Sequence, residues 1–336
     1  MGIVLKCSKN KIPQIGFKPT ILFTEGWNSE IQSATAVLIS EGLIEPMIIL
    51  RKKSEDKENI SHIKKFIIEG SNLEVYAQKL YELRKNKGLS IEDARNLVEK
   101  PNYLSAMMLK MDEVHGVVCG IEYTTKDTLR PALQIIKSSK SSKIITSAII
   151  FERNEELLVF GDCSLILDPT SEELAEITKE LILFTKNSLC TKHLTTAMLS
   201  YSTNGSGFGP SVDKVKKAYE IVKEKPELKN FNIYGELQFD AAYVNSIRSK
   251  KASDCKWENN ANIFVFPNLD SGNIGYKILE RTGGFLAVGP IIIGLDKPMN
   301  DLSRGASTAS VVAIAYVTAS QIRKKGDSNG KICSIY

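Results

Sequence analysis

The order of hydrophobic and polar residues predicts strands that alternate with helices along the first 136 residues. Short apolar runs at Ile21–Phe23, Met47–Leu50 and Gly116–Gly120 are typical of strands buried on both faces. Between them, apolar positions that recur every three to four residues predict helices. The helices are expected at 30–41, at 72–86 with a stop at Gly88, between Ser90 and Pro101, and after Asp127 with Pro131 in the first helical turn.

The second half begins after a polar stretch, Lys137–Lys143, whose low complexity predicts a linker. Two apolar runs on either side of Glu152–Glu155 then predict a hairpin. Strands at 198–201 and 263–266 alternate with helices at 170–186, 211–223, 273–283 and 306–323. Alternation of this kind predicts parallel sheets with helices on both faces, and such sheets bind ligands beyond the carboxyl ends of their strands.

Composition and charge narrow the class of protein. The chain has 336 residues, which favours two domains, and its formal charge of +5 is spread over mixed basic and acidic positions. A nucleic-acid binder usually clusters its basic residues on one face, so no nucleic acid is expected as a partner. No apolar run approaches the ~20 residues that cross a membrane, and no signal-like stretch opens the sequence. A cytoplasmic protein without membrane contact is therefore expected.

Cysteine and histidine are too scattered to suggest a metal centre. The three histidines have no zinc-binding spacing, so neither a metal nor a histidine base is expected. The six cysteines form no Cys-x-x-Cys pair and are expected to be free thiols; they are Cys7, Cys119, Cys163, Cys190, Cys255 and Cys333.

A glycine-rich loop from Ser202 to Pro210 lies between a predicted strand and a predicted helix. Its Ser202, Thr203 and Gly205 could present hydroxyl and backbone N–H donors to an anion at a helix start. The spacing matches neither a dinucleotide-binding fingerprint nor a Walker loop. From the pattern alone, phosphate binding and a plain connection are equally open.

Two further loops combine hydroxyl groups with an arginine before a helix. Taken singly, helix capping is the simpler explanation of each, and Arg84 and one helical face at 273–281 could be solvent-exposed polar residues. Taken together with the glycine loop, they suggest a ligand with several phosphates. The candidates are Asn300, Asp301, Ser303 and Arg304 in the first loop, Thr124, Thr125 and Arg130 in the second, and Asn273, Tyr276, Lys277 and Arg281 on the helix.

The ordered motifs of the chain resemble those of the phosphate acetyltransferase family. The resemblance covers nearly the whole chain and is strongest from 199 to 305. Related butyryl transferases generally lack the Asn-Asp-Leu-Ser-Arg-Gly block, so acetyl is the expected acyl group. The matching segments are Gly235–Ala242, Asn262–Leu269, Gly272–Lys277, Gly289–Pro290 and Lys297–Gly305, with Leu83–Gly88 and Thr128–Gln134 upstream.

The resemblance implies a fold, an activity and partners. The fold would be two α/β/α domains of the isocitrate/isopropylmalate dehydrogenase-like type, with the active site in the interdomain cleft. The first domain would be discontinuous, 1–140 plus 295–336, and the second would span 141–294. The activity would be reversible transfer of an acetyl group between CoA and phosphate, by direct thiolate attack in a ternary complex. The protein would be a homodimer without a tightly bound cofactor.

The resemblance also assigns roles to residues. Ser303 and Arg304 would contact the reacting acetyl phosphate. The family places an aspartate, the general base for CoA, seven residues beyond this serine, and the chain has Ser310 there. Arg84, Arg130 and Arg281 would hold CoA or phosphate, and Ser202, Thr203 and the glycine loop would complete the anion pocket. The chain also departs from the family near its start. Thr24-Glu25 stands where the family has a Pro-Glu pair, and Ile31 stands where the family has an arginine.

Ser310 leaves two hypotheses open. In the first, the chain is an active transferase in which another group, Asp301 or water, assists the deprotonation of CoA. In the second, the chain binds CoA or acetyl phosphate but is catalytically impaired, because the loss of a general base typically costs ~10²–10⁴ in rate.

Overall fold

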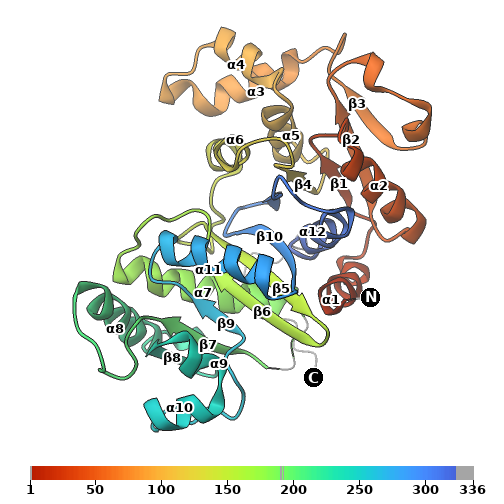
Figure 1. The fold of residues 1–336 in the computed structure, drawn as a ribbon. Helices are drawn as coiled ribbons and strands as arrows, with labels where there is room; N and C mark the ends of the chain where they lie inside the picture. Colours follow the sequence, from red (N-terminus) through yellow and green to blue (C-terminus); the bar gives the residue numbers. More distant parts are fainter. Residues whose placement is uncertain (1, 190, 192, 323–336) are drawn as a thin grey trace. The chain divides into compact units, whose positions relative to one another are not determined.

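The computed structural model describes residues 2–189, 191 and 193–322, and the chain divides into two compact units (Figure 1). One, the parallel-sheet unit, comprises Ser8–Ser141 and Leu295–Tyr336. The other, the mixed-sheet unit, comprises Met1–Cys7 and Ser142–Gly294. The chain therefore leaves the parallel-sheet unit, builds the mixed-sheet unit and returns. The predictions made for Cys190 and Cys333 lie outside the described residues.

Five parallel strands form the sheet of the parallel-sheet unit. The central strands are buried along their whole length, which explains their continuous apolar sequences. The last strand comes from the C-terminal segment and pairs with the strand at 116–119, so that Asp301 lies opposite Cys119. The strands are β1 (Thr20–Phe23), β2 (Glu45–Leu50), β3 (Lys64–Ile67), β4 (Gly116–Cys119) and β11 (Met299–Asp301), in the order β11-β4-β1-β2-β3.

Helices pack on this sheet and begin just beyond its strands. α2 (Ser29–Glu41) follows β1 and packs against β2 and α12 (Thr308–Ser320), while α5 (Pro101–Lys110) packs against β4. The segment from Val311 to Ala319 in α12 is buried all round, so this helix needs no polar face. The other helices of the unit are α3 (Glu74–Arg84), α4 (Ile91–Val98) and α6 (Thr125–Pro131).

The mixed-sheet unit has six strands in the order β10-β5-β6-β9-β7-β8. β5 (Thr146–Arg153) and β6 (Glu156–Gly161) form the predicted hairpin, and the turn residue Asn154 has φ 54°. A two-residue turn can join only antiparallel strands, so the sheet of this half is mixed and not parallel throughout. β10 is also antiparallel to β5, whereas the pairs β6/β9, β9/β7 and β7/β8 are parallel. The remaining strands are β7 (Thr195–Leu199), β8 (Asn232–Leu237), β9 (Ile263–Val265) and β10 (Leu286–Ile293).

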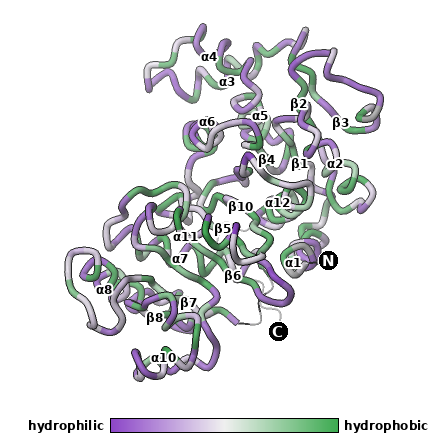
Figure 2. Tube along the Cα trace, in the orientation of Figure 1, coloured by the Kyte–Doolittle hydropathy of each residue, from purple (hydrophilic) through white to green (hydrophobic). Residues whose placement is uncertain are grey.

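An aromatic core holds the mixed sheet to its helices. Phe160 packs against Phe151, Phe264 and Phe266 with ring centroids 5.1 to 5.3 Å apart. The apolar residues of β5 and β10 form a hydrophobic stretch of the trace in Figure 2. The helices are α7 (Ser171–Ser188), α8 (Pro210–Lys223), α9 (Phe239–Tyr243), α10 (Asn245–Lys251) and α11 (Leu269–Thr282), and α1 (Ile3–Lys11) crosses from this unit into the other.

Some details differ from the sequence predictions, and four strands, β3, β8, β10 and β11, were not predicted. Pro101 begins α5 as well as following α4, because proline is well tolerated in the first turn of a helix. Pro131 ends α6 instead of lying in its first turn, and a short π-helix continues at Ala132–Ile136. Met1–Cys7 group with the second segment, and the Val4 N–H donates to the Glu152 carboxylate there at 3.1 Å. Within the described part of the chain, no helix meets the length and apolarity needed to span a bilayer.

Candidate active site

The carboxyl ends of β1, β4 and β11 lie next to each other in the parallel sheet. The loops that follow them begin at Thr24, Gly120 and Leu302, and they lead into α2, α6 and α12. Ligands of such sheets bind at this edge. Most of the candidate residues of this unit lie in these loops or in the first turns of these helices.

Ser303 and Arg304 form an exposed turn immediately after β11. The Leu302 N–H donates to the Cys119 carbonyl at 2.7 Å, and the Ala306 N–H donates to the Ser303 carbonyl at 2.9 Å, so the turn is fixed at both ends. Among the described residues, Arg304 has no hydrogen-bond or ion-pair partner. Its guanidinium group is therefore available to an anion such as phosphate.

The first turn of α12 follows this turn and contains Ser310, the position of the family's aspartate. Ser307 caps the helix, accepting a hydrogen bond from the Ser310 N–H at 3.3 Å. One residue of the same turn, Thr308, donates its hydroxyl to the Glu30 carboxylate, which comes from the first turn of α2. A carboxylate thus lies at this helix start although Ser310 does not supply one.

Glu30 is a residue that sequence reasoning missed. The N–H of Glu30 is held at 2.9 Å by Asn28, the capping residue of α2. This capping pattern, with an acidic residue in the first turn, is visible in the sequence, but it indicates only a helix start. Ile31, which replaces the expected arginine, is fully buried, and Thr24 shares a buried hydrogen bond of 2.8 Å with Ser105.

Asn300 and Asp301 are buried and engaged within the protein. The Asn300 amide donates to Thr318 at 2.8 Å and to Gln321 at 2.7 Å, which ties β11 to the end of α12. Asp301 is 1% exposed. Burial raises the pKa of Asp301 to about 7, against the effect of hydrogen bonds from Thr125 and Thr128 that lower it.

α6 presents the second group of candidates. Thr124 caps the helix, with the Asp127 N–H donating to its hydroxyl at 3.1 Å, as the capping explanation predicts. Arg130 is exposed, and the Arg84 guanidinium donates to the Gln134 carbonyl at 3.4 Å. Burial raises the pKa of the Tyr103 phenol, while the positive charges of Arg130 and Arg84 lower it. Both arginines therefore lie near the Tyr103 phenol.

The glycine loop of the mixed-sheet unit already holds an anion of the protein itself. Glu236 is 3% exposed and accepts hydrogen bonds from the Ser202 hydroxyl at 2.6 Å and from the Gly205 N–H at 2.9 Å. Thr203 accepts the N–H of Gln238 at 2.9 Å. The donors expected to bind phosphate thus stabilise the loop in this structure.

α11 carries the third group. Asn273 donates to the Cys163 carbonyl at 3.1 Å and fixes the start of the helix. The Lys277 ammonium lies 4.9 Å from the centroid of the Tyr276 ring. The Arg281 side chain is 73% exposed, and its Nε atom is 3.9 Å from Glu280. These side chains leave cations accessible on the helix.

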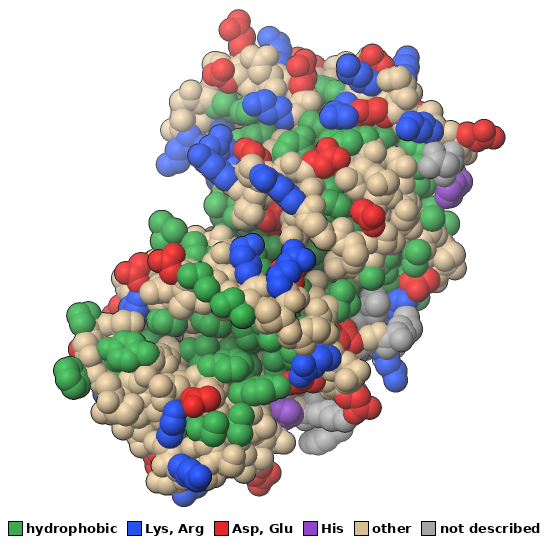
Figure 3. Space-filling model, in the orientation of Figure 1, with side chains coloured by type: hydrophobic (Ala, Val, Ile, Leu, Met, Phe, Trp, Pro, Cys, Tyr) green, Lys and Arg blue, Asp and Glu red, His purple; other side chains and the backbone are tan. Residues whose placement is uncertain are grey.

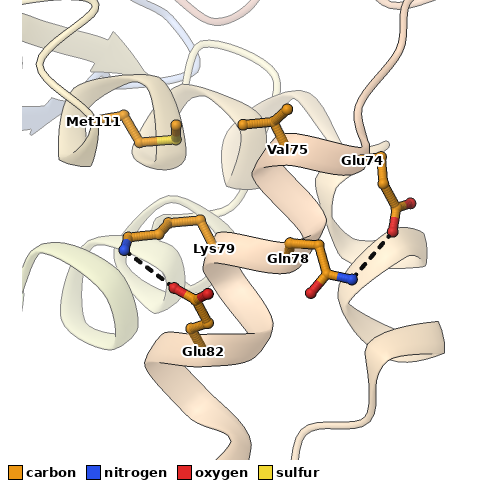
Figure 4. Close-up of a pocket in the computed structure, with 6 residues that line it drawn as sticks. All are labelled: Glu74, Val75, Gln78, Lys79, Glu82 and Met111. Atoms are coloured by element: carbon orange, nitrogen blue, oxygen red, sulfur yellow. Dashed lines mark hydrogen bonds and ion pairs between the residues drawn. The ribbon is translucent and has the colours of Figure 1, made fainter.

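A surface pocket elsewhere does not have the character of an active site. It lies along α3 and is lined by four polar side chains that pair among themselves, as Figure 4 shows. Gln78 donates to Glu74 at 3.4 Å, and Lys79 lies 3.1 Å from Glu82. Its apolar lining comes from Val75 and Met111. No polar groups are left to converge on a ligand, so the strand ends remain the better candidate.

Charged side chains of both signs share the surface of the protein. On the face drawn in Figure 3, blue and red side chains are interspersed over the upper part of the view. In the described part of the chain, no three metal-ligating side chains lie close enough to hold an ion. Hydroxyl groups and Arg304 lie at helix starts beyond the strands of an α/β protein, which makes this edge of the sheet a candidate site for a phosphate-containing ligand.

Comparison with known proteins identifies the family. The model of the family described as "Phosphate acetyl/butaryl transferase" matches residues 7–319, and the chain belongs to this family. The phosphate acetyltransferase of Mycoplasma pneumoniae is 44% identical over 323 residues, which cover 96% of this chain and 99% of that protein.

Solved structures agree with the family and with the fold. A phosphotransacetylase from Streptococcus pyogenes is 38% identical, with a TM-score of 0.85, and the match covers 95% of this chain and 98% of that one. A putative 4-hydroxythreonine-4-phosphate dehydrogenase from Salmonella typhimurium, at 11% identity and a TM-score of 0.52, shares the fold alone; the match covers 91% of this chain and 100% of that one.

Proposed function

We propose that this chain is a phosphate acetyltransferase, which reversibly transfers an acetyl group between CoA and phosphate. The family of the chain supports this activity. The structural observation that carries the proposal is the exposed Ser303–Arg304 turn, whose guanidinium has no partner among the described residues. A hydroxyl and an open guanidinium at the carboxyl edge of a parallel sheet suit a mixed anhydride of acetate and phosphate.

The reaction needs a sulfur nucleophile and stabilisation of two oxygens. In the direction of acetyl-CoA formation, the CoA sulfur bonds to the carbonyl carbon of acetyl phosphate, and the C–O bond to phosphate breaks. Negative charge develops on the carbonyl oxygen and on the departing phosphate. Arg304 and Ser303 stabilise these oxygens, and Arg130 and Arg84 hold a phosphate group of a substrate.

The thiol proton must go to a base, because a thiol of pKa ~8.5 is mostly protonated at neutral pH. In this proposal Glu30 accepts it. Its carboxylate is held by Thr308 at the start of α12, two residues before the position at which the family has its aspartate. Asp301 fits the role poorly, since it is buried and receives hydrogen bonds from within the protein.

The second candidate is a CoA- or acetyl-phosphate-binding protein that has lost catalysis. Ser310 favours it, since a hydroxyl cannot replace a carboxylate as a base. Calorimetric titration with CoA separates the two functions: tight binding without turnover supports the second, and turnover excludes it.

Four finer expectations accompany the proposal. CoA is a substrate, and no tightly bound cofactor is required. The dehydrogenase-like fold and an active site in the interdomain cleft predict that CoA protects residues of both units, including Ser202, Asn273 and Arg281, from footprinting reagents. A homodimer predicts twice the mass of 37.2 kDa in light scattering. A cytoplasmic location predicts recovery in the cytosolic fraction of cells.

The decisive assay mixes the purified chain with acetyl phosphate and CoA and follows the thioester absorbance. We expect acetyl phosphate to be used faster than butyryl phosphate, and Arg304→Ala to abolish most of the rate. Thioester formation no faster than without protein, at any pH, would refute the proposed function.

A further inference from the structure

Two buried carboxyl groups, Glu25 and Asp301, meet at Gly120, where β1, β4 and β11 end. The Gly120 N–H donates to Glu25 Oε1 at 2.8 Å. A Cβ atom on Gly120 would lie 2.0 Å from Asp301 Oδ1, so the second carboxyl group lies directly against the glycine. The two residues are 0% and 1% exposed. Neither carboxyl group is positioned to contact a substrate.

One oxygen of each carboxyl group lacks a hydrogen-bond donor. Glu25 Oε2 and Asp301 Oδ1 are buried, and neither has a partner among the described residues. An unpaired carboxylate oxygen is costly to bury, and two ionised carboxylates at one place repel each other. A proton retained by one of the two groups removes the repulsion between two charges and turns that carboxyl group into a hydrogen-bond donor.

The titration of the two groups agrees with a retained proton. Burial raises the pKa of Glu25 to about 7, against backbone hydrogen bonds from Gly120, Glu122 and Tyr123. Burial likewise raises the pKa of Asp301 to about 7, and the charge of Glu25 adds to this. The titratable groups facing the pair are the Cys119 thiol, the Glu122 carboxylate and the Tyr123 phenol, and the Arg51 guanidinium acts on Tyr123.

The hydrogen bonds of the pair lead to the proposed site. Asp301 accepts from Thr125 and Thr128 of α6, the helix that carries Arg130. Its neighbour Leu302 donates to the Cys119 carbonyl, which fixes the start of the Ser303–Arg304 turn. Glu25 holds the backbone of the loop that leads from β4 to α6.

We propose that Glu25 and Asp301 share one proton, and that this protonated pair positions the Ser303–Arg304 turn relative to α6 and Arg130. Both are positioning residues. Loss of the shared proton places two anions in one buried site, which separates the ends of β1 and β11 and disturbs the turn. The inference rests on the proposed function for its kinetic test.

The test is the pH profile of kcat. The thiolate fraction of CoA grows up to about pH 8.5, so the substrate alone predicts a rate that rises with pH. A carboxyl pair that must keep its proton for activity predicts a contribution to the rate that falls as pH rises. Each pH unit above its pKa lowers the protonated fraction tenfold, so kcat divided by the thiolate fraction of CoA should fall by up to ~100-fold from about pH 7 to about pH 9. This decrease is the alkaline fall.

Amide variants distinguish a role of the retained proton in positioning the turn from a purely structural role of the two side chains. Glu25→Gln and Asp301→Asn each place an N–H donor where the shared proton lies, at every pH. We expect both single variants to lose the alkaline fall in kcat, while Glu25→Ala has a lower kcat at every pH and Glu25→Gln restores most of it. The double amide variant puts two donors face to face and should lower kcat throughout. Glu122→Gln, which changes an exposed carboxylate in the same region, should keep the alkaline fall.

The proposal is overturned if kcat divided by the thiolate fraction of CoA does not fall above about pH 7 in the parent chain, or if this fall persists in both single amide variants. If the parent chain has no transferase activity, the proposed function fails separately, and thermal unfolding tests the pair. A raised carboxyl pKa means that stability is lost as pH rises from the ordinary range to about 7. The melting temperature of the parent should fall over that interval, and those of the single amide variants should fall less; equal slopes refute the pair.

Discussion

Moving the carboxylate that acts as general base from α2 to α12 tests whether Glu30 replaces the aspartate that the family has at position 310. Glu30→Gln removes the charge of the carboxylate at the start of α12 but keeps an oxygen that can accept the Thr308 hydroxyl. The packing and the hydrogen bond are therefore preserved, and only the capacity to take a proton is lost. The expected result is a fall in kcat of ~10²–10⁴, the usual contribution of a general base.

The second half of the experiment returns a carboxylate to the other helix. Ser310→Asp in the Glu30→Gln background restores the family's arrangement, and we expect it to recover at least ~10-fold of the lost kcat. The site tolerates this change. Position 310 lies in the first turn of α12, where a negative charge stabilises a helix by about 0.3–1 kcal/mol, and its N–H is already capped by Ser307.

The assay is steady-state thioester formation at neutral pH, with the melting temperature measured for each variant. Glu92→Gln is the control, because it removes an exposed carboxylate of α4. Its kcat should change by less than about threefold. If Glu30→Gln keeps the parent kcat, or if Ser310→Asp fails to recover activity in a folded double variant, Glu30 is not the base.

Three further predictions concern the surrounding structure. Arg304→Lys keeps the charge but loses the paired donors, and kcat/KM should fall by ~10-fold or more in the same assay; a smaller change contradicts the guanidinium contact. Gly120→Ala should lower the free energy of unfolding by about 2 kcal/mol or more in urea, because its Cβ would meet Asp301 Oδ1 at 2.0 Å and its φ is 111°. Glu236→Ala should cost about 1–3 kcal/mol by removing the buried acceptor of the Ser202 hydroxyl and of the Gly205 N–H, whereas Glu236→Gln should cost less, and equal losses would argue against this role of the carboxylate.

Patterning predicted the parts of the fold that depend on local burial. The apolar runs at 21–23 and 47–50 are strands because both of their faces are covered, and the hairpin at 144–160 follows from its turn. The pattern missed β3, whose Lys64 and Lys65 give no apolar run, and β11, which is only three residues long. It also missed β8 and β10, the two edge strands of the mixed sheet. Such edge strands are defined by their neighbours more than by their own sequence.

The candidate site was predictable only in part, because several of its contacts join residues far apart in the sequence. Ser303 and Arg304 stand out because a motif carries them. The hydroxyl groups of Ser202 and Thr203 looked equally available, yet Glu236 and Gln238, more than thirty residues away, take up their hydrogen bonds. Glu30 and Ser310 are 280 positions apart, and only the packing of α2 against α12 brings their helix starts together. Long-range pairing of this kind has no local signal in a single sequence.

The division of the parallel sheet between two distant segments has a consequence for biosynthesis. On the ribosome, β4 is made long before β11, and its outer edge stays without a neighbour until the chain has emerged past residue 301. Until then, the nascent protein exposes an apolar strand edge that can join other chains. The turn with Ser303 and Arg304 follows β11, so it too can take its place only after the whole mixed-sheet unit has been made.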